Sequence, residues 1–139
     1  MGAIVVGYDG SDSSVAALER AKGLAKGLDD EIVLVFGYAP PGIWGGEIAE
    51  HEEAIEEHGE KLMGEARRQV ETDGVPVSYE LVARRGAEAL LDVARAHDAR
   101  MIVVGSAGEA PLKGAILGST PYKLLHQADR PVLVVPASA

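Results

Sequence analysis

The chain has 139 residues, of which 47% are hydrophobic and 25% charged, the balance of an ordinary globular protein. We expect one domain over residues 1–139 with an aliphatic core, because aromatic residues make up only 4%. The 22 acidic residues outnumber the 13 basic ones and leave a formal net charge of −9, which argues against a nucleic-acid partner. The absence of cysteine excludes disulfides, thiolate metal sites and thiol catalysis.

The N-terminus carries no recognisable targeting signal. Met1-Gly2 leads straight into the apolar run Ala3 to Val6, with no basic region before it. Val6 stands where a myristoylation signal requires Ser or Thr. No segment approaches the length of a transmembrane helix, so we expect a cytoplasmic protein without a membrane partner.

The first predicted element is a buried strand, Ala3 to Tyr8, a short β-branched apolar run that ends in a polar turn. Helical spacing of apolar residues then predicts a helix from Ser13 to Leu28, with Asp12 or Ser13 as its cap. A second buried strand is predicted at Glu31 to Tyr38. This opening half is therefore a strand, helix and strand.

A long helix is predicted from Glu47 to Thr72, with Gly59 and Gly64 as weak points in it. After it, Val75 to Ala83 alternates apolar and polar residues, which predicts a less buried strand at an edge of the sheet. The Arg84-Arg85 pair that follows is expected to be exposed.

The last predicted elements are a helix from Ala87 to His97, a strand from Met101 to Val104, a short helix from Pro121 to Gln127 and a strand from Pro131 to Pro136. Alternating strands and helices with short connections imply an α/β fold, with a parallel sheet covered by helices on both faces. In such open sheets, ligands bind beyond the carboxyl ends of the strands, where the strand order reverses.

Glycines recur after the strand that ends at Val104, at Gly105, Gly108, Gly114 and Gly118, and a hydroxyl pair follows, Ser119-Thr120. Glycine lets backbone N–H groups approach an anion, and a helix start presents unpaired donors, so the stretch favours a phosphate site. A second interpretation is that the glycines are turn residues and that Ser119 or Thr120 caps a helix beginning near Pro121. The residues alone leave both interpretations open.

The spacing Gly105-x2-Gly108-x9-Gly118-Ser119 resembles the nucleotide loop of universal stress proteins. The resemblance extends to Ile4-Val5-Val6-Gly7-Tyr8-Asp9-Gly10-Ser11 and to Arg130-Pro131-Val132-Leu133-Val134-Val135-Pro136, and so spans the chain. It implies an open, doubly wound five-stranded parallel sheet of order 3-2-1-4-5, of the adenine nucleotide alpha-hydrolase type. It also implies an ATP-binding protein, with Mg²⁺ shared between phosphates and protein oxygens, that acts in stress response or signalling.

The resemblance places Asp9 near the ribose and phosphates and the backbone of Val35 to Gly37 beside the adenine. A structural alternative for Asp9 is that it anchors the turn onto the N–H groups of Ser11 and Asp12. Lys113 could reach a phosphate as a flexible cation. The predicted nucleotide-binding residues are Tyr8, Asp9, Gly10, Ser11, Val35, Phe36, Gly37, Val104, Gly105, Ser106, Gly108, Lys113, Gly118, Ser119 and Thr120.

Two other functions stay open. The run from Tyr8 to Ser13 is similar to the Ser-Gly-Gly-x-Asp-Ser loop of ATP pyrophosphatases, although only Gly10, Asp12 and Ser13 match. The other alternative is a nucleotide-free interaction protein. No catalytic constellation is recognisable, so at most slow ATP hydrolysis is expected. A Glu109 side chain that points at the phosphates rather than away from them would disfavour a triphosphate, which keeps AMP as an alternative to ATP.

The sequence identifies no metal ligands. His51 and His58 flank four glutamates, but Ile55 occupies the second histidine position of an H-E-x-x-H motif, so an acidic solvated face is the preferred interpretation. The apolar strand Pro131 to Pro136 lies at a sheet edge in the implied order, and such an edge requires cover. We expect a homodimer that pairs this strand across a two-fold axis, as the resemblance also implies. The alternative is a monomer in which the neighbouring helix or the tail Ala137 to Ala139 shields the edge.

Overall fold

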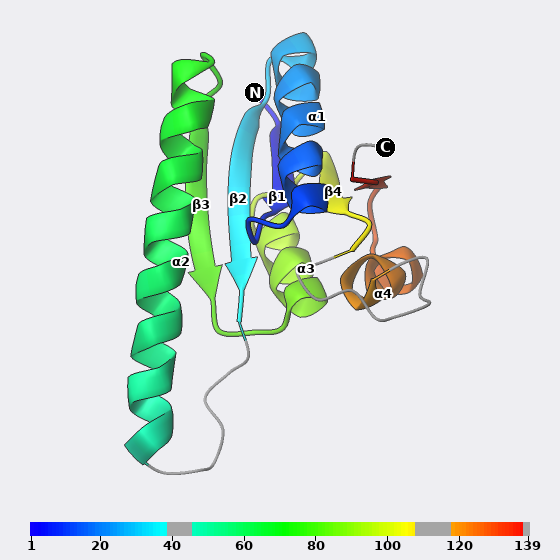
Figure 1. The fold of residues 1–139 in the computed structure, drawn as a ribbon. Helices are drawn as coiled ribbons and strands as arrows, with labels where there is room; N and C mark the ends of the chain where they lie inside the picture. The colour runs from blue at the N-terminus through cyan, green and yellow to red at the C-terminus, as the bar shows by residue number, and fades with distance from the viewer. Residues whose placement is uncertain (39–45, 108–117, 138–139) are drawn as a thin grey trace.

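The computed structural model describes residues 1–38, 46–107 and 118–137, with the backbone alone for 46–52. Strands and helices alternate along these residues (Figure 1). The strands are β1 (Ala3–Gly7), β2 (Glu31–Gly37), β3 (Val77–Val82), β4 (Met101–Gly105) and β5 (Val132–Val135). The helices are α1 (Asp12–Leu28), α2 (Gly46–Thr72), α3 (Gly86–Ala96) and α4 (Ser119–Gln127).

The five strands form one parallel sheet in the order β3-β2-β1-β4-β5. This confirms the predicted fold class and strand order. β1 lies in the middle, paired with β2 on one side and β4 on the other. The strand order therefore reverses between β1 and β4, and the chain leaves their carboxyl ends side by side.

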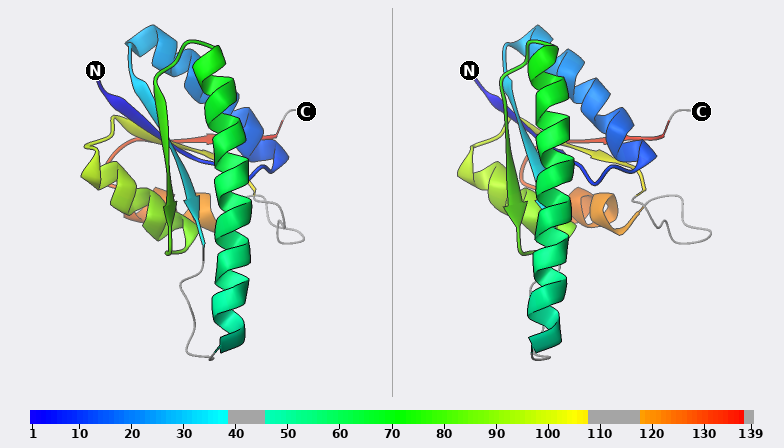
Figure 2. Two further views of the ribbon diagram at one scale, coloured as in Figure 1. Left: turned by 90° about the vertical axis from the view of Figure 1, so that its left-hand side faces the viewer. Right: turned by 60° about the vertical axis from the view of Figure 1, so that its left-hand side comes forward.

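Helices cover both faces of the sheet (Figures 1 and 2). One apolar core contains side chains of α1 and α2, among them Leu18, Met63 and Val70. The other contains side chains of α3 and α4, among them Leu90 and Leu124. The N-terminal part of α2 runs on past the ends of the strands (Figure 1). Among the described residues, no helix is long and apolar enough to cross a membrane.

The two edge strands are the least buried of the sheet, as predicted for the third strand. Every residue of β3 is at least partly exposed. In β5, Leu133 is 38% exposed, whereas Val132 and Val134 pack partly against the core that contains α3 and α4. A parallel edge strand presents unpaired backbone groups on its outer side.

Two helix starts differ from the predictions. α1 is capped by Ser11, whose Oγ accepts a hydrogen bond from the Ser14 N–H, and not by Asp12 or Ser13. α4 begins at Ser119 and not at Pro121, and its cap is Gly118, which has no side chain to bond. Proline fits any of the first three helical positions, because none of their N–H groups has an intrahelical acceptor.

Gly59 brings α2 close to the sheet and is therefore more than a weak point in the helix. A Cβ added at Gly59 would lie 2.8 Å from Leu81 Cδ2 and 3.1 Å from Phe36 Cδ1. Gly64, by contrast, would meet only the end of the Arg68 side chain, at 3.8 Å. Close helix-to-sheet contact at Gly59 compensates for its low helix propensity.

A buried carboxylate joins three segments at the amino end of the sheet. Asp30 is 2% exposed and accepts hydrogen bonds from the Gly2 N–H at 2.9 Å and from Arg100 Nε at 2.6 Å. The hydrogen bond from Arg100 is the main cause that lowers the pKa of Asp30, against the opposing effect of burial, and the Gly2 N–H lowers it further. The folded protein thus stabilises the charged form of the Asp30 carboxylate.

We predict that Asp30→Asn lowers the free energy of unfolding by about 2 kcal/mol at pH 7, since hydrogen bonds to a charged acceptor are lost. Because the folded pKa is depressed, the contribution is present above the unfolded pKa of about 3.9 and is lost as pH falls through the folded value. Urea unfolding from pH 7 to pH 3 should show the wild type converging on the variant. The control is Asp98→Asn at a fully exposed carboxylate; an equal loss in both variants would contradict the assignment.

Candidate functional site

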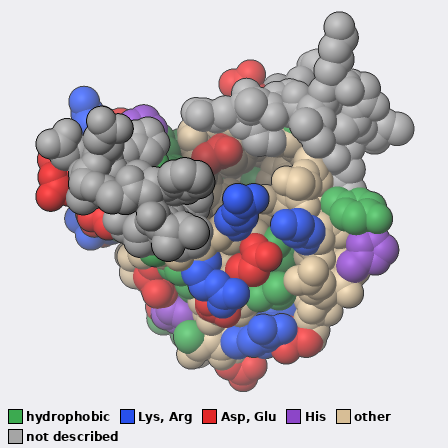
Figure 3. Space-filling view, turned by 90° about the horizontal axis from the view of Figure 1, so that it is seen from below, with side chains coloured by type: hydrophobic (Ala, Val, Ile, Leu, Met, Phe, Trp, Pro, Cys, Tyr) green, Lys and Arg blue, Asp and Glu red, His purple; other side chains and the backbone are tan. Residues whose placement is uncertain are grey.

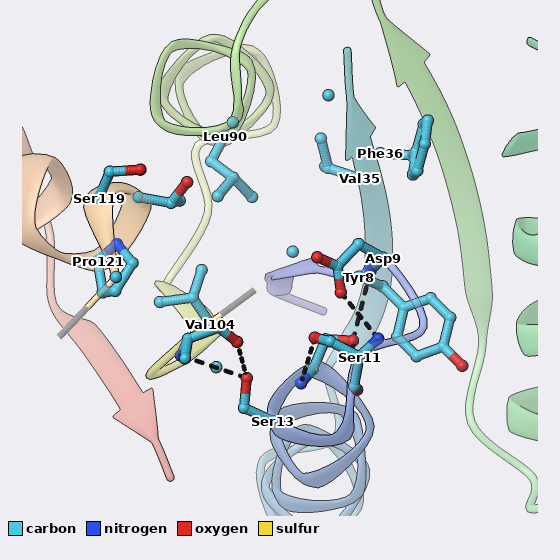
Figure 4. A pocket seen from close by; sticks show the side chains of 18 residues that line it. Tyr8, Asp9, Ser11, Ser13, Val35, Phe36, Leu90, Val104, Ser119 and Pro121 are labelled. Atoms are coloured by element: carbon cyan, nitrogen blue, oxygen red, sulfur yellow. Dashed lines mark hydrogen bonds between the residues drawn. The ribbon is translucent and has the colours of Figure 1, made fainter. Parts of the chain in front are cut away.

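A cavity of about 290 Å³ opens at the carboxyl ends of β1 and β4, where the strand order reverses (Figure 4). Its walls come from the ends of β1, β2 and β4 and from the starts of α1, α3 and α4. The described lining residues are Gly7, Tyr8, Asp9, Ser11, Ser13, Ser14, Val35, Phe36, Gly37, Gly86, Leu90, Val104, Gly105, Ala107, Gly118, Ser119, Thr120 and Pro121.

The turn from β1 into α1 is held by its own side chains. Asp9 Oδ1 accepts a hydrogen bond from the Ser11 N–H at 2.9 Å. One of the two carboxylate oxygens of Asp9 therefore anchors the turn. Ser14 Oγ donates to the Ser11 carbonyl at 2.9 Å and accepts from the Asp9 N–H at 3.4 Å. Gly10, at φ +83°, makes the left-handed turn that these bonds require.

Asp9 and Tyr8 are adjacent in sequence but point in different directions (Figure 4). The Asp9 carboxylate is directed at the cavity, whereas the Tyr8 ring is directed away from it and packs partly against the core that contains α1 and α2. Burial raises the pKa of Tyr8, and the negative charges of Asp9 and Glu65 raise it further. Tyr8 is therefore neutral at physiological pH.

The segment after β4 is packed tightly against the start of α1. A Cβ added at Gly105 would lie 2.6 Å from the Ser13 carbonyl carbon, a separation that real Cβ atoms do not show. Ser13 Oγ in turn donates a hydrogen bond to the Ala107 carbonyl and accepts one from the Ala107 N–H at 3.3 Å. Gly105 is thus required by this packing, in addition to the phosphate role predicted for it.

The start of α4 faces the same cavity. The Gly118 N–H is already used, donating to the Ser106 carbonyl at 2.7 Å, so this glycine offers no free backbone donor. The N–H groups of Ser119 and Thr120, at the first two helical positions, have no acceptor within the helix. Their hydroxyls and these two amides are the donors that α4 presents to the cavity.

The start of α3 touches both the end of β2 and the start of α4. A Cβ at Gly37 would lie 2.8 Å from the Arg84 carbonyl oxygen, and one at Gly86 would lie 2.7 Å from Thr120 Oγ1. Glycine at both positions lets α3 begin at the cavity wall. Three helices, α1, α3 and α4, therefore begin around one cavity, and each start carries a partial positive charge.

The remainder of the lining is apolar. Val35 at the end of β2, Leu90 of α3 and Val104 of β4 border the cavity and are almost completely buried (Figure 4). The cavity thus combines an apolar part between β2, β4 and α3 with a polar part between the starts of α1 and α4. Asp9 is the only charged side chain among the described lining residues.

Most of the predicted site residues line this cavity: Tyr8, Asp9, Ser11, Val35, Phe36, Gly37, Val104, Gly105, Gly118, Ser119 and Thr120. Gly10 and Ser106 are not among the lining residues, since Gly10 makes the turn and Ser106 bonds to Gly118 and Val135. Gly108, Glu109, Lys113 and Gly114 lie outside the described residues.

Seven lining residues are not among the predicted nucleotide-binding residues: Gly7, Ser13, Ser14, Gly86, Leu90, Ala107 and Pro121. Ser13 and Ser14 follow Asp9 within five residues, in the first turn of α1, and this short separation in sequence was a signal that they are close to it. Gly86, directly after the exposed Arg84-Arg85 pair, offered a second signal, because a glycine at a helix start next to a strand end permits close approach.

The four glutamates between His51 and His58 lie on α2 and are not among the described residues that line the cavity. Glu53, Glu57 and His58 are exposed, and Glu56 accepts a hydrogen bond from the Tyr38 hydroxyl at 2.9 Å. The side chains of His51 and Glu52 lie outside the described part. Within that part, no three His, Cys, Asp or Glu side chains are grouped so that they could hold a metal ion.

Comparison with known proteins matches residues 1–136 to the universal stress protein family. The chain belongs to that family. A universal stress protein of Thermus aquaticus is 35% identical over 136 residues, covering 95% of this chain and 96% of its own.

Solved universal stress proteins have the same fold. One from Lactobacillus plantarum superposes with a TM-score of 0.86 at 20% identity, over 96% of this chain and 97% of its own. A universal stress protein in complex with cAMP superposes with a TM-score of 0.75 at 27% identity, over 99% of this chain and 98% of its own.

We predict that Gly105→Ala lowers the free energy of unfolding by about 1–3 kcal/mol, because the added methyl group forces the end of β4 away from the start of α1. Gly23→Ala in the middle of α1, where an added Cβ meets nothing within 4 Å, is the matched control and should instead stabilise by about 0.5–1 kcal/mol. Urea unfolding measures both. A Gly105→Ala variant as stable as the wild type would show that the contact with Ser13 does not constrain the fold.

Proposed function

We propose that this universal stress protein binds an adenine nucleotide in the cavity between β1 and β4 and acts as a nucleotide-regulated stress or signalling protein. The observation that carries the proposal is the convergence of three helix starts on one cavity. Each helix start is equivalent to roughly half a positive charge and presents unpaired N–H groups. An anionic group is the complementary ligand.

The polar part of the cavity suits a phosphate. Ser119 and Thr120 each supply an N–H group and a hydroxyl, and Ser11 and Ser13 border the opposite wall. Seen from the carboxyl ends of the strands, Lys and Arg side chains lie beside Asp and Glu side chains in the middle of this face (Figure 3). This face is thus of mixed charge, and the attraction for an anion rests on the helix starts.

The apolar part suits a purine base. Val35, Leu90 and Val104 provide apolar contacts, and the carboxyl end of β2 provides backbone groups to the edge of a base. The relative solved in complex with cAMP, 27% identical over almost the whole chain, supports adenine nucleotide as the ligand class. We assign the ribose to the region of Asp9, between the two parts.

The choice among adenine nucleotides follows from charge. Asp9 is the only charged lining residue described, and it repels a triphosphate unless a cation lies between them. With ATP, Asp9 would hold Mg²⁺ together with the phosphates, an arrangement typical of this ion. AMP or cAMP requires no such cation. We assign no efficient reaction to the site and propose at most slow ATP hydrolysis.

Mass spectrometry of ligand released from freshly purified protein, followed by calorimetric titration, tests the proposal. We expect AMP, cAMP or ATP to be released or to bind with micromolar or better affinity. GMP serves as the control nucleotide, because it carries the same phosphate on a different base. An empty protein that binds none of the three adenine nucleotides would refute the proposal and favour a nucleotide-free interaction protein.

We predict that Asp9→Ala weakens AMP binding about tenfold or more, because a charged acceptor for the ribose hydroxyls is lost. Asp9→Asn keeps an oxygen for the Ser11 N–H but replaces the other acceptor with a donor, and it should weaken binding without loosening the turn. Asp12→Ala, an exposed carboxylate in the first turn of α1, is the matched control. Normal AMP binding by an Asp9→Ala protein that melts far lower would leave Asp9 only its turn-anchoring role.

We further propose that the protein is a homodimer in which β5 pairs with β5 of a second copy. The edge position of β5 and the exposure of its Leu133 support the proposal. A two-fold pairing would satisfy the free backbone groups of both strands and cover the exposed side chains.

We predict that Leu133→Lys converts the dimer to monomers, as measured by light scattering at micromolar concentration. Leu133 suits this test because its side chain is exposed, whereas Val134 packs partly against the core that contains α3 and α4. Leu28→Lys, at a leucine that is 41% exposed at the far end of α1, is the control and should leave the dimer intact. A wild-type protein that is monomeric under these conditions would end the proposal.

A further inference from the structure

Ser13 connects two parts of the cavity wall that are 94 residues apart in sequence. It lies at the second position of α1 and is only 3% exposed. Its hydroxyl both donates to the Ala107 carbonyl and accepts from the Ala107 N–H (Figure 4). The cap of α1 is formed by Ser11, so Ser13 is not needed for that purpose.

The segment that Ser13 holds is also bound by two other elements. The Ser106 N–H donates to the Val135 carbonyl at 2.9 Å, at the end of β5. The Ser106 carbonyl accepts from the Gly118 N–H at 2.7 Å, and Gly118 is the cap of α4. The start of α1 is thus connected to the start of α4 through Ser13, Ala107, Ser106 and Gly118.

We propose that Ser13 is a positioning residue that sets the α4 donors, Ser119 and Thr120, at the distance from the α1 start that a phosphate requires. This inference rests on the proposed nucleotide function. The bonds of Ser13 to Ala107 fix the Ser106 carbonyl, and that carbonyl fixes the Gly118 N–H at the cap of α4. Anion binding by preorganised donors depends on such fixed positions.

The role is specific to the phosphate part of the ligand. Val35 belongs to β2 and Leu90 to α3, and neither element is bound by Ser13 in the described part of the chain. Loss of the Ser13 hydroxyl should therefore displace the phosphate donors and leave the apolar part in place. A nucleoside without phosphate should not detect the change.

The test is calorimetric titration of wild type, Ser13→Ala and Ser13→Cys with adenosine and with AMP. Ser13→Ala removes the hydroxyl, and Ser13→Cys fills the space with a group that is only a weak hydrogen-bond donor and acceptor. We expect both variants to bind AMP about fivefold to tenfold more weakly, the range that one lost hydrogen bond supplies, and adenosine with unchanged affinity. Thr72→Ala, which removes an exposed hydroxyl that bonds the Arg68 carbonyl on α2, is the control.

Several outcomes of these titrations would overturn the inference. Unchanged AMP affinity in Ser13→Ala would show that the hydroxyl does not position the donors. Equal weakening for adenosine and AMP would reduce Ser13 to a general wall residue. Full AMP affinity in Ser13→Cys would show that filled space, and not hydrogen bonding, matters. A wild type that binds neither ligand nor any other adenine nucleotide would instead overturn the proposed function, and this inference with it.

Amide hydrogen exchange of the unliganded protein provides a readout that does not depend on any ligand. In Ser13→Ala, exchange of the Ala107 and Gly118 N–H groups should become faster, while exchange in β2 and β3 should not change. Uniformly faster exchange throughout the sheet would indicate general destabilisation and contradict a positioning role.

Discussion

The structure depends on the handedness of its strand connections. The chain runs from β1 through α1 to β2, toward one edge of the sheet. It runs from β4 through α4 to β5, toward the other edge. Because a connection between parallel strands is right-handed, the two helices must lie on opposite faces, as the two separate apolar cores show. The chain therefore diverges at the carboxyl ends of β1 and β4, and the cavity lies where it diverges.

Small residues determine what that divergence can hold. Gly105 lets β4 end against the start of α1, and Gly37 and Gly86 let α3 begin against the end of β2 and the start of α4. Three helix starts can then surround a cavity of about 290 Å³. The positive ends of three helices face the cavity, and none of its described lining residues has a basic side chain. Asp9 adds one negative charge. Packing requirements and the proposed affinity for anions thus depend on the same glycines.

The fold could be predicted from the sequence because strands such as Ile4 to Val6 are buried on both faces and must be apolar throughout. The exact helix starts could not, since Ser11, Asp12 and Ser13 are all good caps and Pro121 suits any of three positions. Motif spacing led to most of the described cavity lining, but it did not show that the Gly118 N–H is already bonded. The contact of Ser13 with Ala107 was missed because the two residues lie 94 positions apart, a relation that no local pattern contains.

We propose that the starts of α1, α3 and α4 together form one anion-binding cavity for an adenine nucleotide. Amide chemical shifts measured by NMR during titration with AMP test it most directly. We expect the largest changes at Ser119, Thr120 and the turn from Tyr8 to Ser11, smaller ones at Val35 to Gly37, and none at the amino end of the sheet around Asp30. Changes confined to the acidic part of α2, around Glu53 and Glu57, or no changes at all at millimolar AMP, would contradict it.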